Sequence, residues 1–167
     1  MDERDLLARV ASGDEAAFLR FYDLYADRVH RFALTILRAR HLAEEVVQET
    51  MVAVWKGAQR FRGASKVSTW VFGIARNQAL GLLRKESRAA REVLPPLVEP
   101  DPADAIGRQQ RVLAALDTLP EEHRAVVFLA FYEGLPYREI ATALGIPEGT
   151  VKSRMYHAKR GLLEKLK

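Results

Sequence analysis

Basic and hydroxyl side chains recur at helical spacing near the C-terminus, between Tyr137 and Arg160. This segment, YREIATALGIPEGTVKSRMYHAKR, predicts two short helices joined by a tight turn, because Gly145 suits a positive φ angle and Pro147 suits the start of a helix. Lys, Arg, Ser and Thr are the side chains that contact phosphates and base edges in the major groove. The pattern is typical of a helix-turn-helix that binds duplex DNA. The expected contacts are Glu148, Thr150, Lys152, Ser153, Arg154, His157 and Arg160.

An ordinary helical hairpin with a solvated basic face is the alternative for this segment. The placement of the small Ala141 at the expected helix crossing, together with Gly145 in the turn and Pro147 after it, favours DNA binding. The side chains expected to form the buried seam between the two helices are Leu144, Ile146, Val151, Met155, Ala158 and Leu162.

A second segment, FRGASKVSTWVFGIARNQALGLLRK (Phe61–Lys85), mixes aromatic and basic side chains. Aromatic rings stack on unpaired bases and basic groups follow the phosphate backbone, so this mixture suits single-stranded nucleic acid better than duplex. Core packing is the alternative for Trp70 and Phe72. Plain surface exposure is the alternative for Arg76, Asn77 and Arg84.

The helical segment AEEVVQETMVAVW (Ala43–Trp55) has the opposite charge. Its acidic and amide side chains lie around one expected exposed face. Such a face would repel phosphate, so a basic protein surface is the more suitable partner. A solvated charged face is the alternative. The residues concerned are Glu44, Glu45, Gln48 and Glu49.

The charge of the chain is divided into blocks. The net charge is +4 with a pI near 9.5, a mild excess that suits nucleic acid. Eight basic residues and one acid occur in 60–91, and six basic residues and two acids in 148–167. Between them, 92–104 holds four acids and no base. Two basic islands with an acidic spacer indicate two DNA-facing modules.

The spacer also holds four of the seven prolines, at positions 95, 96, 100 and 102. Proline removes a backbone donor and disfavours helix in the residue before it, so residues 90–105 are predicted to form an extended linker. The segments on both sides have helical periodicity, and no stretch predicts a strand. The predicted fold is all-α: two small helical domains joined by a proline-rich acidic linker.

Helix boundaries follow from the same patterns. Asp14 or Ser12 is expected to cap a long helix that carries an apolar stripe from Phe18 to Leu37. Further helices are expected at 42–58, from a cap at Ser68 or Thr69 to about residue 90, at 109–119, and from Pro120 to about Tyr132.

Several function classes are disfavoured. The chain has no cysteine, which excludes disulfides and thiolate chemistry and suits the cytosol. We expect neither a signal peptide nor a membrane span. The four histidines are scattered, and there is no P-loop, glycine-rich nucleotide fingerprint or nucleophile–base motif. We therefore expect no catalytic residues, no metal site and no cofactor.

Four motifs occur in register along the chain: the acidic run ending in VQET with Trp55, the run TWVFGIARN, the helix LPEEHRAVVFL and the recognition segment EGTVKSR. Together they resemble the sigma factors of bacterial RNA polymerase, specifically the extracytoplasmic-function (ECF) group. The resemblance implies a sigma region 2 domain at 1–90, a linker at 91–107 and a sigma region 4 helix-turn-helix domain at 108–167.

The resemblance also implies a role for each segment. The helix Glu148–Arg160 would read the −35 element as duplex. A loop and the helix that follows it would hold the opened non-template strand near −10, and would also hold a base of that strand that is flipped out of the stack. The −10 residues would be Arg62, Ser65, Lys66, Ser68, Thr69, Trp70, Arg76, Asn77 and Arg84. The acidic face would dock on the β′ clamp helices of core polymerase through Glu44, Glu45, Gln48, Glu49 and Trp55.

Further partners implied by the family are the β flap, bound by the C-terminal domain, and an anti-sigma factor. The linker would pass towards the active-site channel of the polymerase, with its acids resembling nucleic acid. The main alternative is a stand-alone helix-turn-helix regulator that binds operator DNA as a dimer. That alternative leaves the acidic face and the segment Phe61–Lys85 without a role.

Overall fold

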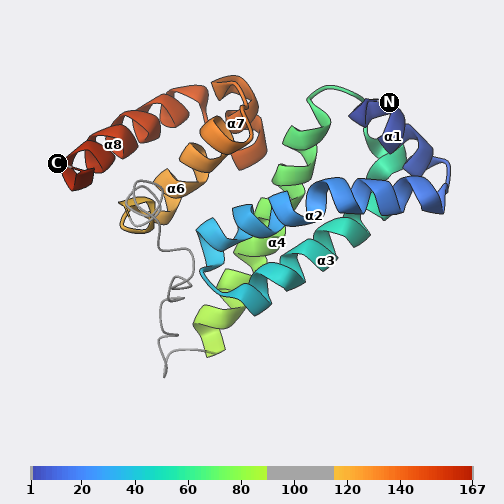
Figure 1. The fold of residues 1–167 in the computed structure, drawn as a ribbon, viewed down its shortest axis with the longest axis horizontal. Helices are drawn as coiled ribbons and strands as arrows, with labels where there is room; N and C mark the ends of the chain where they lie inside the picture. The colour runs from blue at the N-terminus through green and yellow to red at the C-terminus, as the bar shows by residue number, and fades with distance from the viewer. Residues whose placement is uncertain (1, 90–114, 167) are drawn as a thin grey trace.

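The computed structural model describes residues 2–89 and 115–166, most of which are helical (Figure 1). No strand occurs among these residues, so the all-α prediction is confirmed. The predicted linker and most of the helix predicted at 109–119 lie outside the described residues, although residues 115–117 are helical. The elements are α1 (Glu3–Ala11), α2 (Glu15–Leu37), α3 (Arg40–Gly57), the 3-10 turn η1 (Ala58–Arg60), α4 (Val67–Ala89), α6 (Glu121–Val127), the π-helical turn η3 (Phe128–Tyr132), α7 (Tyr137–Leu144) and α8 (Glu148–Leu166).

The N-terminal half is a bundle of α1 to α4 around aromatic side chains of α2. The predicted cap at Asp14 is confirmed, because its carboxylate accepts a hydrogen bond from the backbone N–H of Ala17 at 3.1 Å. The stripe along α2 is buried, with Phe21, Tyr25 and Phe32 fully enclosed. The inner face of α3 is also buried, at Leu42, Val46, Thr50, Met51 and Val54.

The start of α4 differs from the prediction. The helix begins at Val67, so the cap expected at Ser68 or Thr69 is wrong. Both residues lie inside the first turn, where they are 8% and 1% exposed. Val67 is itself buried and packs in the core with Val71, one turn later. The burial of Val67 and Val71 therefore determines where α4 begins. It outweighs the preference of Ser68 and Thr69 for a capping position.

The C-terminal half contains the predicted helix-turn-helix. Gly145 has φ +65°, the left-handed conformation expected of it, and the N–H of Ile146 donates to the carbonyl of Ala141 at 3.1 Å. The N–H of Thr150 donates to the carbonyl of Pro147 at 3.0 Å, which begins α8. The preceding helix reaches Tyr132 as predicted, but its regular α-helical part, α6, ends at Val127 and the last five residues form the π-helical η3.

The two halves share one hydrophobic core. The ring of Phe128, at the start of η3, lies 5.8 Å from that of Phe32 and 6.3 Å from that of Phe72, measured between centroids. Arg124, only 8% exposed, donates from Nε to the carbonyl of Thr35 at 2.9 Å. Helix α7 packs against α4, and α6 packs against α2. The C-terminal half is therefore held against the N-terminal bundle.

Candidate nucleic-acid interface

Helix α8 has one buried face and one exposed face, as the helix-turn-helix pattern predicts. Val151, Met155 and Ala158 are buried against α6 and α7. The opposite face carries the seven residues predicted to contact DNA. Thr150 and Arg154 are half-buried. The other five are exposed: Glu148, Lys152, Ser153, His157 and Arg160.

The charged groups of this face have weak partners within the protein. Lys152 lies 4.0 Å from Glu148 one turn earlier, and Arg154 lies 3.8 Å from Glu122 of α6. Ion pairs at such distances on an exposed surface contribute little to stability. A phosphate group can therefore replace the carboxylate at either cation without a large cost.

Tyr156 is a residue of this face that the sequence reasoning missed. Its side chain is 56% exposed, and its hydroxyl accepts a hydrogen bond from Arg160 Nη1 at 3.1 Å. The guanidinium carbon also lies 5.8 Å from the centre of the Tyr156 ring. The signal was present in the sequence, since the two residues are four positions apart and so share a helix face.

Two imidazoles stack where α6 meets α8. The rings of His123 and His157 have centroids 6.2 Å apart and planes inclined by 13°. Burial lowers the pKa of His123, and the neighbouring His157 lowers it further. Both effects disfavour the charged form of His123, so this contact favours neutral imidazole.

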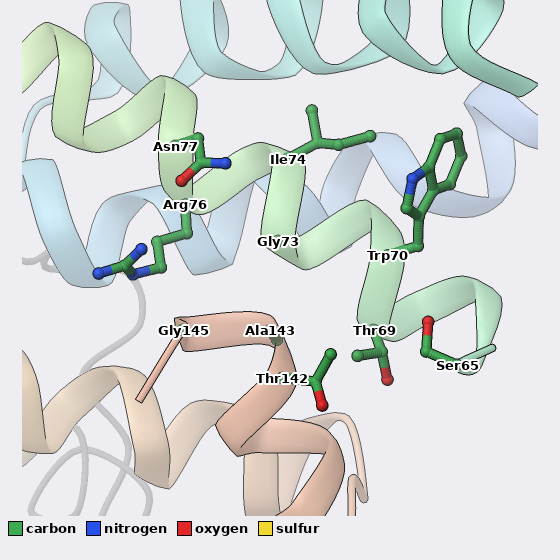
Figure 2. Close-up of a pocket in the computed structure, with 10 residues that line it drawn as sticks. All are labelled: Ser65, Thr69, Trp70, Gly73, Ile74, Arg76, Asn77, Thr142, Ala143 and Gly145. Atoms are coloured by element: carbon green, nitrogen blue, oxygen red, sulfur yellow. The ribbon is translucent and has the colours of Figure 1, made fainter. Parts of the chain in front are cut away.

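A pocket of about 350 Å³ lies between α4 and the helix-turn-helix (Figure 2). One wall comes from α4 and the loop before it, and the other from α7 and the turn that follows α7. The structure brings five of the nine predicted −10 residues to this pocket: Ser65, Thr69, Trp70, Arg76 and Asn77.

The other four predicted −10 residues do not line the pocket. Arg62 and Lys66 are exposed in the loop before α4, and Arg84 is exposed two turns beyond Asn77. Ser68 is buried in the first turn of α4. Arg62, Lys66 and Arg84 are therefore exposed outside the pocket, and Ser68 is hidden.

The pocket residues differ in how available they are to a ligand. Asn77 is exposed and Arg76 is half-buried. Thr69 is buried, and its hydroxyl oxygen has no hydrogen-bond partner among residues 2–89 and 115–166. A buried hydroxyl without a partner carries a desolvation cost of about 1–3 kcal/mol.

The two aromatic side chains of this segment have different environments. Phe72 is fully buried and contacts Phe32 at 5.3 Å between ring centroids, so core packing is confirmed for it. Trp70 is half-buried, with its ring 5.3 Å from that of Phe61 and close to Gly57. One edge of the indole therefore packs on the protein, and Trp70 is also among the residues that line the pocket (Figure 2).

The acidic residues predicted to bind a protein lie together on the outer face of α3. Glu44, Glu45, Gln48 and Glu49 are all exposed. Trp55 follows on the same face, 39% exposed, with its ring 5.1 Å from that of Phe18. Val52, which is 46% exposed, was missed, although the spacing 45, 48, 52 and 55 places it on this face. The face combines negative charge with exposed apolar groups, as protein-binding surfaces do.

In residues 2–89 and 115–166, no three or more His, Asp or Glu side chains come close enough to hold a metal ion. Within the same ranges, no helix has the length and apolar content needed to cross a membrane.

Comparison with known proteins identifies the family. The family model for Sigma-70 region 2 matches residues 21–89, and that for Sigma-70, region 4 matches residues 109–162. The chain is 39% identical over 148 residues to the ECF RNA polymerase sigma factor RpoE of Cereibacter sphaeroides, covering 85% of this chain and 82% of that protein. The chain belongs to the ECF sigma factors.

Two solved structures have a fold similar to that of this chain. The first is CnrH in complex with the cytosolic domain of CnrY, with a TM-score of 0.72, 25% identity and coverage of 98% of this chain and 96% of that one. The second is the sigma factor RpoE of Bartonella quintana in complex with the anti-sigma factor NepR, with a TM-score of 0.77, 28% identity and coverage of 89% and 96%.

The two matched regions settle the general function of this ECF sigma factor. It is a DNA-binding initiation factor that directs RNA polymerase to specific promoters. The stand-alone helix-turn-helix regulator is not favoured, because such a reading has no place for region 2.

Proposed function

We propose that this sigma factor uses three separate surfaces, each with its own partner. The observation that supports this most strongly is the separation of charge among the helices. The exposed faces of α8 and of the loop before α4 are basic, whereas the outer face of α3 is acidic. Phosphate is attracted to the first two and repelled by the third.

The face of α8 around Lys152 and Arg154 binds the −35 element as duplex. Arg154 is the residue we assign to a guanine edge, because its fork of donors matches the guanine O6 and N7 atoms. Lys152 and Arg160 are assigned to phosphates, with Tyr156 holding Arg160 in position. Glu148, Thr150, Ser153 and His157 complete this surface.

The loop before α4 and the pocket beside it bind the opened non-template strand near −10. Trp70 offers an aromatic ring for stacking and Asn77 offers an amide for a base edge. Arg62 and Lys66 are exposed in the loop and Arg76 lies in the pocket, where each can meet the backbone of the strand. Ser65, Ser68, Thr69 and Arg84 belong to the same proposed surface.

The outer face of α3 docks on the β′ clamp helices of core polymerase. Glu45, Gln48 and Glu49 supply the polar contacts, and Trp55 and Val52 supply apolar ones. The C-terminal domain contacts the β flap. This arrangement ties both DNA-binding surfaces to the enzyme, which carries out the chemistry, so the sigma factor itself needs no catalytic residue or cofactor.

We place the region 2 domain at 1–90, the linker at 91–107 and the region 4 domain at 108–167, which agrees with the matched ranges 21–89 and 109–162. The protein acts in the cytoplasm, where the polymerase and promoters are. An anti-sigma factor is a further proposed partner. Its support is the likeness to RpoE of Bartonella quintana, whose structure is a complex with the anti-sigma factor NepR.

Transcription in vitro on a promoter library tests this function. Core polymerase is combined with the purified sigma factor, and initiation sites are read by sequencing the transcripts. We expect transcripts from promoters that share two short elements separated by a fixed spacer. Tight binding of the protein alone to duplex sites, without any promoter-specific transcripts, would favour a stand-alone regulator.

A further inference from the structure

Helix α1 precedes the part of the chain that the Sigma-70 region 2 family model matches, which begins at residue 21. It is nevertheless packed into the bundle, because Leu6, Leu7 and Val10 are buried among the side chains of the core. Figure 1 shows α1 beside the segment that connects α3 to α4. The helix thus lies next to the loop to which we assign binding of the −10 strand.

Two side-chain hydrogen bonds join α1 to this segment. Nη2 of Arg4, in the first turn of α1, donates to the carbonyl oxygen of Gly63 at 3.2 Å. Nε2 of Gln59, in η1, donates to the carbonyl oxygen of Ala11, the last residue of α1, at 3.2 Å. The bond from Gln59 fixes the start of the segment, and the bond from Arg4 reaches the middle of the loop.

The first turn of α1, from which Arg4 extends, is itself fixed. Oδ1 of Asp2 accepts a hydrogen bond from the backbone N–H of Asp5 at 2.8 Å and caps the helix. The carboxylate of Glu3 accepts a hydrogen bond from the hydroxyl of Tyr25 at 2.7 Å, and Tyr25 is fully buried in α2. The backbone at Arg4 is therefore held against the bundle.

Gly63 suits the contact with Arg4 in two ways. Its φ is +75°, in the left-handed region that glycine adopts without strain. A Cβ built on Gly63 would lie 3.2 Å from Nη1 of Arg4, which is closer than most Cβ contacts in proteins. The absence of a side chain therefore lets the loop turn and lets the guanidinium lie against its backbone.

The ends of the loop are held by apolar packing, but its middle is not. The ring of Phe61 lies 5.3 Å from that of Trp70, measured between centroids, and Val67 is buried in the core. The residues exposed between these anchors include Arg62, Ala64 and Lys66. The hydrogen bond from Arg4 therefore restrains the stretch of loop that carries the exposed cations.

We propose that Arg4 is a positioning residue for recognition of the −10 element. Through Gly63 it holds the loop so that Arg62 and Lys66 meet the opened strand in one arrangement, which lowers the cost of ordering the loop on binding. Arg4 is not assigned to the strand itself, because the first turn of α1 is acidic and repels phosphate. The proposal rests on the assignment of the −10 surface made above.

A spin label beside Gly63 tests whether Arg4 holds the loop. The chain has no cysteine, so Ala64→Cys provides a single attachment site, and this site is exposed. We expect Arg4→Ala to sharpen the electron paramagnetic resonance spectrum of the label, because a released loop moves faster. Arg9→Ala removes the same charge from an exposed site on the same helix and should leave the spectrum unchanged. The same spectrum with and without Arg4 would refute the proposed hold.

Transcription from the promoter library tests the consequence for recognition. Holoenzyme is formed with each variant, and the −10 preference is the ratio of transcripts with the favoured base to those with any other base. We expect Arg4→Ala to lower this ratio by roughly three- to tenfold, the range for loss of one hydrogen bond, and to leave −35 duplex affinity within about twofold. Arg9→Ala should keep the parent ratio. An unchanged ratio in Arg4→Ala would overturn the proposal.

Gly63→Ala separates positioning from charge. It keeps the guanidinium of Arg4 but pushes the loop away from it, so it should lower the −10 preference as Arg4→Ala does. The double variant Arg4→Ala/Gly63→Ala should be no worse than the poorer single variant, because both changes remove the same contact. Losses that add in the double variant would mean that Arg4 acts independently of Gly63, which contradicts a positioning role.

The variant Arg62→Ala/Lys66→Ala separates failure of this proposal from failure of the −10 assignment. Lowered initiation or a changed −10 preference in this variant, with the parent preference in Arg4→Ala, would leave the assignment intact and refute the role of Arg4 alone. If neither variant differed from the parent protein, the loop would have no part in −10 recognition, and the proposal would fail with it.

Discussion

The guanidinium of Arg28 and the carboxylate of Glu133 form a two-point ion pair although 105 positions separate them in the chain. Arg28 belongs to α2, in the region 2 half, and Glu133 follows η3, in the region 4 half. The pair is also connected to Glu3 of α1 at 3.4 Å. A single guanidinium thus links the first helix, the long central helix and the C-terminal half.

Removing one partner of this pair should destabilise the folded protein. Glu133→Ala leaves Arg28 without its main acceptor, and we expect the free energy of unfolding to fall by about 1–3 kcal/mol, between the values for exposed and buried pairs. Urea denaturation followed by circular dichroism measures the change.

The exposed pair of Asp27 and Arg31, 3.0 Å apart, provides the matched control. Asp27→Ala should change the free energy of unfolding by less than about 0.5 kcal/mol, because both side chains are well solvated. Similar losses for the two variants would contradict the structural role of the Arg28–Glu133 pair.

Lys152 should contribute one phosphate contact to binding of the −35 duplex. Lys152→Ala should weaken binding on all sequences alike and reduce the slope of log K against log salt concentration by about 1, because one fewer counterion is released. Titrations by fluorescence anisotropy at several salt concentrations give the slope. Lys165→Ala, at the far end of α8, should leave the slope unchanged.

The outer face of α3 should determine affinity for core polymerase. Glu45→Lys/Glu49→Lys reverses two charges, and we expect core binding to weaken at least roughly tenfold, through a slower association rate above all. Binding of the isolated sigma factor to the −35 duplex should not change. Glu15→Lys/Asp23→Lys, at two exposed sites on α2, makes the same change in net charge and serves as the control. A core affinity that fell equally in the control would argue against a docking role for this face.

His123 should make the stability of the fold sensitive to acid. Its pKa is lowered in the folded protein, by burial first and by His157 second. As the pH falls below about 6.5, the unfolded chain takes up the proton before the folded protein does, so stability falls until the lower folded-state pKa is reached. The thermal midpoint of His123→Gln should therefore drop less between pH 7.5 and pH 5.5 than that of the parent protein. An equal drop in both would show that other groups account for the acid sensitivity.

Local features of this fold could be predicted because each depends on residues close in sequence. The carboxylate of Asp14 caps α2 by accepting a hydrogen bond from the backbone N–H of Ala17, three residues later. Gly145 takes its positive φ because the turn requires it. The buried stripes of α2 and α8 follow from helical periodicity alone.

Features that depend on distant contacts could not be predicted. The start of α4 moves to Val67 because that side chain enters a core built from other helices. The change from α6 to η3 has no periodic signature, and it accompanies the packing of Phe128 on Phe32 and Phe72. The pocket between α4 and α7 exists only because the two halves pack together. For the candidate site, the sequence therefore indicated which residues to consider but not which of them the opposite half covers.

The division of labour between the two DNA-binding surfaces is the central claim, and two alanine variants measured in two assays test it most directly. Arg154→Ala should weaken −35 duplex binding by about 1–3 kcal/mol, while strand opening on a promoter with a pre-bound −35 element stays near normal. Asn77→Ala should leave duplex binding intact and reduce opening at the upstream edge of the bubble, read by 2-aminopurine fluorescence with core polymerase present. Equal defects of both variants in both assays would contradict the account.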